Sequence, residues 1–245
     1  MKWLKGLLEK FRNYKSEHGY SCDICESELF DYPKHRLCKD CENALFKNDG
    51  SRCPVCGRKT VAAGVCLTCK AHFPVFEKGF SPLVYDGTSA SVVNRFKNGE
   101  RYLCYLLAER MAEDFIRETG GVEPENTIVA AVPATDRSQR ERGYNQAAEL
   151  AKVFAEKTGL CYEPELLKKG RETKMQKKGT AKERAENVSG AFRVHQRTEC
   201  RGKTVVLVDD IMTTGSTGSE CARVLKNAGA DKVLFVAASS VREKR

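Results

Sequence analysis

Residues 204–217 have the sequence TVVLVDDIMTTGST, in which an apolar run gives way to two carboxylates and then to small polar residues. The run from Val205 to Val208 is β-branched and aliphatic, which is typical of a strand buried on both faces in a parallel sheet. A helical pattern follows over residues 218–227 and stops before Gly229. The segment therefore predicts a strand, a short turn and a helix in immediate succession, the repeating unit of an α/β fold.

The turn after this strand has the features of a phosphate site. At a helix N-terminus, unpaired backbone N–H groups and the helix dipole both favour an anion. A glycine allows the backbone to approach a ligand closely, and hydroxyl side chains supply further donors. The residues concerned are Thr213, Thr214, Gly215, Ser216 and Thr217. The simpler alternative is a buried strand followed by an N-capped helix that binds nothing.

Asp209 and Asp210 make the pattern more specific. They follow the apolar run directly, so they would face the crevice at the carboxyl ends of the strands, where open α/β sheets bind ligands. Two carboxylates beside a phosphate loop would repel a bare polyphosphate. They suit a ligand with hydroxyls next to its phosphate, such as a ribose 5-phosphate, because each carboxylate can accept charge-assisted hydrogen bonds.

The string VVLVDDIMTTGST, residues 205–217, resembles the phosphoribosyl-diphosphate (PRPP) binding motif of type I phosphoribosyltransferases. The resemblance implies a phosphoribosyltransferase-like doubly wound parallel sheet that binds PRPP together with Mg²⁺. It implies transfer of ribose 5-phosphate through an oxocarbenium-like transition state, with Asp209 and Asp210 as the catalytic pair that offsets the positive charge. The PRPP-binding residues that it implies in this segment are Val208, Asp209, Asp210, Thr213, Thr214, Gly215, Ser216 and Thr217.

The cysteines set the amino-terminal part of the chain apart. The sequence has 245 residues and 12 cysteines, of which eight form four C-x-x-C pairs before residue 70. Two thiolates of one tight turn can bind the same tetrahedral ion, so the four pairs predict two structural zinc sites of four thiolates each. We expect sequential sites, first pair with second and third with fourth, with an interleaved arrangement as the alternative. The ligands would be Cys22, Cys25, Cys38, Cys41, Cys53, Cys56, Cys66 and Cys69.

Three segments are predicted from these patterns: a basic amphipathic helix in residues 1–20, a double zinc-binding module in 21–75, and the α/β domain in 80–245, with 74–82 as a linker. The apolar side of residues 1–14 would pack on the protein itself or, alternatively, touch a membrane surface or a partner. The sequence has no stretch of the length needed to span a membrane and no pattern of a signal peptide. We therefore expect a cytoplasmic protein, with peripheral membrane contact as the alternative.

A second loop rich in arginine is expected beside the first. Residues 127–132 predict another buried strand, and the loop 133–146 follows it and leads into an amphipathic helix that stops near Gly159. Arg137 and Arg142 in this loop are candidates to bind pyrophosphate, since guanidinium groups bind such oxygens with two parallel hydrogen bonds. The alternative is a solvated basic turn.

Several segments together resemble the ComF family, in which a cysteine-rich zinc module precedes a phosphoribosyltransferase-like domain. The matching segments are VPATDRSQRERGYNQ (132–146), RETKMQ (171–176), Arg184 with Asn187, GAF (190–192), and, earlier, YDG (85–87) with Lys97. This resemblance implies a role in natural competence and DNA uptake. It leaves two hypotheses open: a PRPP-dependent transferase of unknown acceptor, or a protein that senses PRPP or binds single-stranded DNA without turnover.

The charge of the chain is compatible with both hypotheses. The net charge is +9, which favours acidic partners such as nucleotides, nucleic acid or anionic lipid. Residues 168–186 are strongly basic and polar. In type I phosphoribosyltransferases the corresponding segment is a flap that closes over PRPP and excludes water. The other interpretation is an arm for single-stranded DNA, and one segment can serve both purposes.

Overall fold

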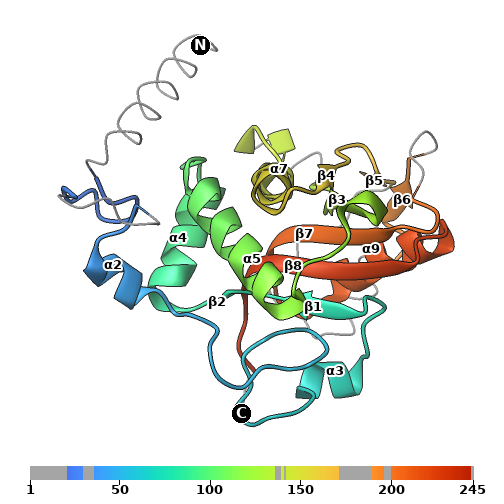
Figure 1. The fold of residues 1–245 in the computed structure, drawn as a ribbon, viewed down its shortest axis with the longest axis horizontal. Helices are drawn as coiled ribbons and strands as arrows, with labels where there is room; N and C mark the ends of the chain where they lie inside the picture. The colour runs from blue at the N-terminus through green and yellow to red at the C-terminus, as the bar shows by residue number, and fades with distance from the viewer. Residues whose placement is uncertain are drawn as a thin grey trace. The chain divides into compact units, whose positions relative to one another are not determined.

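Figure 1 shows the protein as a computed structural model, which describes residues 21–29, 36–135, 139–140, 142–170, 189–195 and 200–243. The chain separates into two compact units, Met1–Phe46 and Lys47–Arg245. The predicted amphipathic helix in residues 1–14 and most of the basic segment 168–186 lie outside the described residues, as does Arg137.

The first unit is organised around its cysteines rather than around an apolar core. Its described part contains one short helix, α2 (Lys39–Ala44), in which the Sγ of Cys38 accepts a hydrogen bond from the backbone N–H of Cys41. Leu37 and Leu45 are its buried aliphatic side chains in the described residues. A core this small contributes little to folding, so a bound metal ion would have to supply much of the stability of this unit.

The second unit is built on a parallel sheet. The strand order is β1-β8-β7-β3-β4, with β2 also pairing with β8, and every pair in this sheet is parallel. The strands are β1 (Lys78–Phe80), β2 (Leu83–Val84), β3 (Thr127–Ala131), β4 (Cys161–Tyr162), β7 (Thr204–Met212) and β8 (Lys232–Ser240). A separate antiparallel ribbon pairs β5 (Leu167–Lys169) with β6 (Phe192–Val194). The predicted α/β fold with a parallel sheet is confirmed.

The helices lie on both faces of this sheet. The longer helices are α4 (Gly87–Lys97), α5 (Leu103–Thr119), α7 (Gln146–Thr158) and α9 (Ser216–Asn227); the short ones are α3 (Leu67–Ala71) and the 3-10 turn η1 (Pro124–Asn126). Helix α5 packs against α7 on one side, whereas α9 packs on β7 and β8 (Figure 1). The connection from β3 through α7 to β4 runs one way along the sheet, and that from β7 through α9 to β8 runs the other way. Right-handed crossovers in opposite directions place their helices on opposite faces.

The reversal of direction lies between β3 and β7, which are neighbours in the sheet. In open α/β sheets this switch point opens a crevice at the carboxyl ends of the two strands, because the chains leaving them turn to opposite faces. The loop 213–215 follows β7 there, and the loop that begins at Val132 follows β3. The fold therefore brings both loops singled out by the sequence to the carboxyl-terminal end of the central strands.

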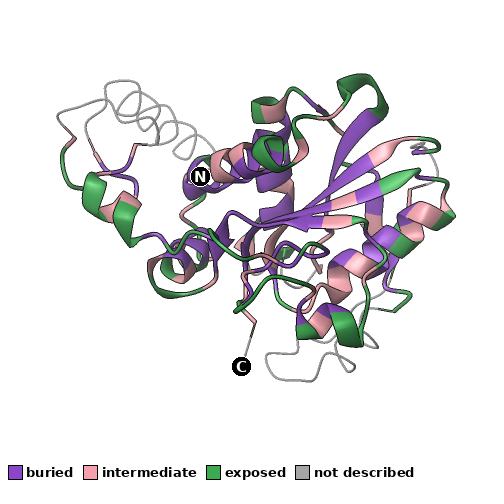
Figure 2. Cartoon of the chain, turned by 60° about the horizontal axis from the view of Figure 1, so that its bottom comes forward, coloured by how far each residue is buried: buried purple, intermediate pink, exposed green. Residues whose placement is uncertain are grey.

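Aromatic and aliphatic side chains fill the space between sheet and helices. All four residues of the run 205–208 are fully buried, and Figure 2 shows buried residues concentrated along the strands and on the inward faces of the helices. Phe115 of α5 makes edge-to-face contacts with Phe80 of β1 and Phe154 of α7, with ring centroids 5.2 and 5.4 Å apart. These contacts join sheet and helices through rings that each bury a large apolar area.

The linker predicted for residues 74–82 is wrong. Strand β1 lies within it and pairs with residues 234–236 of β8, and both Phe76 and Phe80 are buried. The prolines that flank the segment resemble those of a linker, but here they bound a three-residue edge strand.

Helix α4 was not predicted. Asp86 caps its N-terminus by accepting a hydrogen bond from the N–H of Gly87. Among the described residues, none of the helices has the length and apolar character needed to cross a bilayer.

Candidate functional site

Asp209 and Asp210 lie in β7, just beyond Val208, the last residue of this strand that pairs with β3. Both are half-buried, and Asp209 is opposite Ala237 in the register between β7 and β8. Successive side chains on a strand point to opposite faces, so the two carboxylates diverge. Asp210 points toward α4, where its Oδ2 is 3.0 Å from the Nζ of Lys97. The negative charge of Asp209 acts on the buried thiol of Cys221 in α9 and helps to raise the pKa of that thiol.

The two carboxyls differ in their electrostatics. Burial, followed by the charge of Asp210, raises the pKa of Asp209 to about 7. The backbone N–H of Asp210 opposes this shift by donating a hydrogen bond of 2.8 Å to the Oδ1 of Asp209. A carboxyl that titrates near neutral pH can hold or release a proton when a ligand binds. Such perturbed groups gather at functional sites more often than elsewhere.

Lys97 is the site residue to which the sequence assigned no role. It is the last residue of α4, and its side chain is 22% exposed, while that of its partner Asp210 is 14% exposed. Both side chains therefore keep part of their surface in contact with solvent. The sequence offered only the presence of Lys97 in the family pattern, because a lysine at a helix end is usually a solvated group that complements the helix dipole.

The turn after β7 forms the second part of the site. Gly215 has a φ of +82° and is the N-cap of α9, a conformation that favours glycine. The hydroxyls of Thr214 and Ser216 are 2.8 Å apart. The first N–H groups of α9 have no acceptor within the helix, so the turn presents both backbone and hydroxyl donors. The structure thus places Val208, the two aspartates and the five residues 213–217 along one continuous strand, turn and helix.

The loop that follows β3 begins at the same end of the sheet as the turn after β7. The N–H of Val132 donates to the carbonyl of Val208 (2.9 Å), so the two chains stay paired to the end of the sheet. In this loop Arg142 donates from Nη1 to the Oε1 of Gln146 (3.1 Å). Neither this contact nor the described part of the loop tests the prediction that Arg137 and Arg142 bind pyrophosphate, and it stays a prediction.

The segment RGYNQ (142–146) in this loop connects several helices and strands through hydrogen bonds. The hydroxyl of Tyr144 donates to the carbonyl of Phe96 at the end of α4. Asn145 caps α7 by accepting from the N–H of Ala147 (3.1 Å) and donates from Nδ2 to the carbonyl of Val132 (3.2 Å). The segment therefore ties α4, β3 and α7 together next to Lys97, and its family pattern has an architectural reason as well as any role in binding.

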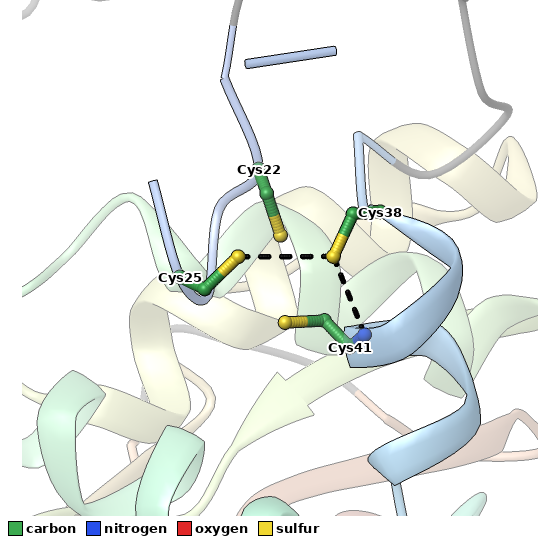
Figure 3. A group of neighbouring side chains, drawn as sticks. All are labelled: Cys22, Cys25, Cys38 and Cys41. Carbon is green, nitrogen blue, oxygen red and sulfur yellow. Dashed lines mark hydrogen bonds between the residues drawn. The ribbon is translucent and has the colours of Figure 1, made fainter. Parts of the chain in front are cut away.

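The cysteine pairs assemble in sequential order. Cys22, Cys25, Cys38 and Cys41 form one group, and Cys53, Cys56, Cys66 and Cys69 form the other, with the sulfur atoms of each group within 4.8 Å of one another. Figure 3 shows the side chains of the first group pointing toward a common centre. This grouping is the one that the order of the pairs predicted, and the interleaved alternative is excluded.

The spacing of the sulfurs fits a tetrahedral ion. The Sγ atoms of Cys25 and Cys38 are 3.7 Å apart, as are those of Cys56 and Cys66. Four sulfurs at a Zn–S distance of 2.3 Å around one zinc ion would be roughly 3.8 Å from one another. Hydrogen bonds from Ser27 lower the pKa of the Cys25 thiol to about 6, which favours the thiolate that a metal binds. Each group could therefore hold one zinc ion.

The second cysteine group belongs to the same compact unit as the sheet. Its first turn lies against strand β1, where the N–H of Gly79 donates to the carbonyl of Val55 (2.8 Å). A Cβ on Gly57 would come within 2.3 Å of the carbonyl oxygen of Gly79, so only glycine allows this approach. The buried amide of Asn48 donates to the carbonyls of Gly57 and Ser81 (2.7 and 2.8 Å). The turn is thus fixed to the edge of the sheet.

Comparison with known proteins identifies one domain family and several relatives. The family described as "Phosphoribosyl transferase domain" matches residues 140–245. "DNA utilization protein YhgH" of Salmonella typhimurium is 28% identical over 201 residues, which are 80% of this chain and 87% of that protein. "Competence protein ComFC" of Bacillus subtilis is 24% identical over 230 residues, or 86% and 91%. The chain is thus similar over most of its length to competence and DNA utilization proteins of the ComF type, and its carboxyl-terminal part matches the phosphoribosyltransferase domain family.

Among solved structures, the glutamine PRPP amidotransferase of B. subtilis is 22% identical, with a TM-score of 0.35. That match covers 62% of this chain and 27% of the amidotransferase chain. The phosphoribosyltransferase match contains β7, the turn 213–217 and the segment RGYNQ from Arg142 onward. Lys97 and the second cysteine group precede the matched residues, so their place beside the site follows from the structure alone.

Proposed function

We propose that this chain binds PRPP together with Mg²⁺ at the carboxyl ends of β7 and β3, and that it acts, like the ComF proteins it resembles, in the uptake or use of DNA. The observation that carries the proposal is the pair Asp209 and Asp210 at the switch point, followed at once by the hydroxyl-rich turn at the start of α9. Carboxylates and anion-binding donors on one short stretch match a ligand that presents both a diol and a phosphate.

In this proposal each part of the site binds one part of the ligand. The turn 213–217 binds the 5-phosphate through backbone N–H groups and hydroxyls. Asp209 and Asp210 accept hydrogen bonds from the two ribose hydroxyls. Lys97 then exchanges its contact with Asp210 for a contact with the pyrophosphate, assisted by the arginines of the loop after β3. Its partial exposure supports this role, because the ammonium can reach a ligand without leaving the site.

The donor set also suits Mg²⁺. This ion prefers oxygen ligands, keeps several waters and usually binds through one or two carboxylates plus substrate phosphates. Asp209 and Asp210, with the oxygens of a bound ribose and pyrophosphate, provide such a set. When bound, Mg²⁺ would supply a Lewis acid that neutralises charge on the leaving pyrophosphate.

The residues themselves would contribute orientation and charge to a transfer reaction. The two aspartates would hold the ribose while positive charge develops at its anomeric carbon, and the nearby negative charge would offset it. We assign no general base among the described residues, because the acceptor that such a base would activate is not identified. The proposal therefore covers PRPP binding first, and pyrophosphate release would separate a transferase from a non-catalytic PRPP sensor.

A role with DNA rests on the relatives, whose names state DNA utilization and competence. Binding of single-stranded DNA is the second candidate function, and one observation favours it. Phe73, just after α3, is 71% exposed, and it stands next to the exposed His72 and close in sequence to Lys70. Exposed aromatic rings near a lysine are the kind of surface on which unpaired bases stack.

Thermal unfolding with and without PRPP and Mg²⁺ tests the proposed function. At a ligand concentration a hundredfold above its dissociation constant, binding should add about 2.7 kcal/mol of stability to the wild type. The double variant Asp209→Asn/Asp210→Asn should show no such gain. Asp231→Asn is the matched control, because that exposed carboxylate directly precedes β8, at the amino-terminal end of the strands and thus away from the site. A wild type that PRPP does not stabilise would rule out both the transferase and the sensor.

A further inference from the structure

Arg58 joins the second cysteine group to the turn after β7. Its guanidinium donates from Nε to the Sγ of Cys56 (3.3 Å), from Nη1 to the hydroxyl of Thr68 (3.5 Å), and from Nη2 to the carbonyl of Thr213 (2.6 Å). The residue is only 4% exposed. Arg58 is therefore a buried cation with one side on the thiol group and the other on the first residue of the proposed phosphate turn.

A buried arginine needs negative charge nearby, since an unpaired charge in the interior is strongly destabilising. The sulfur of Cys56 lies at hydrogen-bond distance from Arg58. A zinc ion bound by four thiolates carries two net negative charges, so a filled second group would balance the charge of Arg58. The metal would thus hold the guanidinium in the position from which it reaches Thr213.

The contact with Thr213 fixes a peptide plane in the turn. In a trans peptide the C=O of one residue and the N–H of the next point in opposite directions, and all described peptide bonds are trans. By holding the carbonyl of Thr213 on its own side, Arg58 aims the N–H of Thr214 away from the cysteine group. That N–H belongs to the set of donors that would meet the phosphate.

Two further contacts join the same parts of the chain. The N–H of Val75 donates to the hydroxyl of Ser219 in the first turn of α9 (3.0 Å). A Cβ at Gly215 would lie 3.7 Å from the ring of Phe76, which also packs on Phe235 of β8 with ring centroids 5.2 Å apart. The segment that carries the second cysteine group therefore meets the turn at Thr213 and Gly215 and helix α9 at Ser219, and at Gly57 it lies against strand β1.

We propose that the second cysteine group, with Arg58 as positioning residue, sets the conformation of the turn 213–217 and hence its affinity for a sugar phosphate. Metal bound to Cys53, Cys56, Cys66 and Cys69 keeps Arg58 on Thr213, and loss of that metal or of Arg58 loosens the turn. The effect on affinity rests on the proposed PRPP function, whereas the effect on the turn does not.

The test compares the full-length chain with Arg58→Met, Arg58→Lys and the control Arg36→Met. Arg36 lies beside the first cysteine group and binds Asp23 (2.9 Å), within the other compact unit. Three properties are measured: zinc content, amide hydrogen exchange over residues 213–219 without ligand, and calorimetric affinity for PRPP with Mg²⁺.

Arg58→Met should keep two zinc ions, exchange faster over residues 213–219 and bind PRPP about tenfold more weakly, as expected for one lost charge-assisted hydrogen bond. Arg58→Lys keeps a charge beside the thiolates but cannot span Cys56 and Thr213 with one ammonium, so it should behave in the same way. It also keeps the test valid if the Met variant loses metal. Arg36→Met should match the wild type in exchange and affinity.

Unchanged exchange over residues 213–219 in both Arg58 variants would overturn the inference. If the wild type itself does not bind PRPP, the proposed function fails, and the exchange measurement alone then decides whether Arg58 positions the turn. Faster exchange in Arg36→Met to the same degree would also contradict the inference, because it would show that the turn responds to any lost arginine.

Discussion

The ammonium of Lys97 lies 3.0 Å from the carboxylate of Asp210, and this contact joins the end of α4 to the carboxyl end of β7. The position of Lys97 is set from a distance, since the hydroxyl of Tyr144 holds the carbonyl of the preceding Phe96. With side chains 22% and 14% exposed, the pair is largely withdrawn from water, so its attraction is offset by the cost of desolvating both charges. Its place at the switch point suggests that the lysine serves a ligand.

Replacing Lys97 tests this assignment. Lys97→Met should weaken the affinity for PRPP with Mg²⁺ by about tenfold or more, because it removes one cation from the pyrophosphate position. Lys97→Arg should retain part of the affinity. Lys232→Met, which removes an exposed lysine at the amino end of β8, is the control. Calorimetry that finds equal affinity in Lys97→Met and the control would remove Lys97 from the site.

Asp209 should make stability depend on pH. Its folded-state pKa of about 7 lies above the value of about 3.9 for an unfolded chain. Between these values the folded chain keeps a proton that the unfolded chain has released, so this group lowers stability as pH rises from about 4 to 7. Asp209→Asn should therefore unfold at a higher temperature than the wild type at pH 8, by a free energy on the order of 2 kcal/mol, and the gain should shrink at pH 5.

The same exchange at Asp231 is the control for this experiment, since it also replaces a carboxylate by an amide but at an exposed position. It should give no comparable gain at pH 8. If Asp209→Asn is destabilised at pH 8, or if its gain is as large at pH 5, the carboxyl of Asp209 is ionised in the folded chain over this range and the account of its burial is wrong.

The two cysteine groups predict the metal content. Purified protein should contain two zinc ions per chain, and the double variant Cys22→Ser/Cys25→Ser should contain one, measured by elemental analysis. Because the first group lies in the other compact unit, that variant should keep its affinity for PRPP. One ion per chain in the wild type would contradict the assignment of two sites.

A DNA arm in the basic segment predicts a dependence on its lysines. Lys174, Lys177 and Lys178 replaced together by Ala should weaken binding of single-stranded DNA and reduce the slope of affinity against salt, because fewer counterions are displaced. The triple variant of Lys152, Arg201 and Lys232 to Ala removes the same charge from exposed positions in the described fold. Equal DNA affinity in the two triple variants would exclude the arm.

Local patterns in the sequence were sufficient for the centre of the fold. The run 205–208 has no polar residue, and its full burial in β7 follows directly from that composition. The helix that stops near Gly159 was likewise predicted, and α7 ends at that glycine with a left-handed φ of +71°. The sequential grouping of the cysteines was also expected, but the spacing left an interleaved arrangement open, and only the structure decides between them.

Contacts between distant segments could not be predicted in this way. The hydrogen bond from Arg58 to Thr213 joins residues 155 positions apart, and no local sequence pattern around either residue predicts it. Residues 74–82 resembled a linker because a three-residue strand is too short to show a period, and only its pairing with β8 identifies it. The ion pair of Lys97 could not be predicted for the same reason, since its partner Asp210 belongs to a strand more than a hundred residues later.

A crystal structure of the full chain with PRPP and Mg²⁺ tests the central claim most directly. We expect the 5-phosphate on the turn 213–217, the ribose hydroxyls on Asp209 and Asp210, and Lys97 moved from Asp210 toward the pyrophosphate. A structure in which the crevice stays empty at saturating ligand, or in which PRPP lies elsewhere while Lys97 keeps its contact with Asp210, would contradict the account.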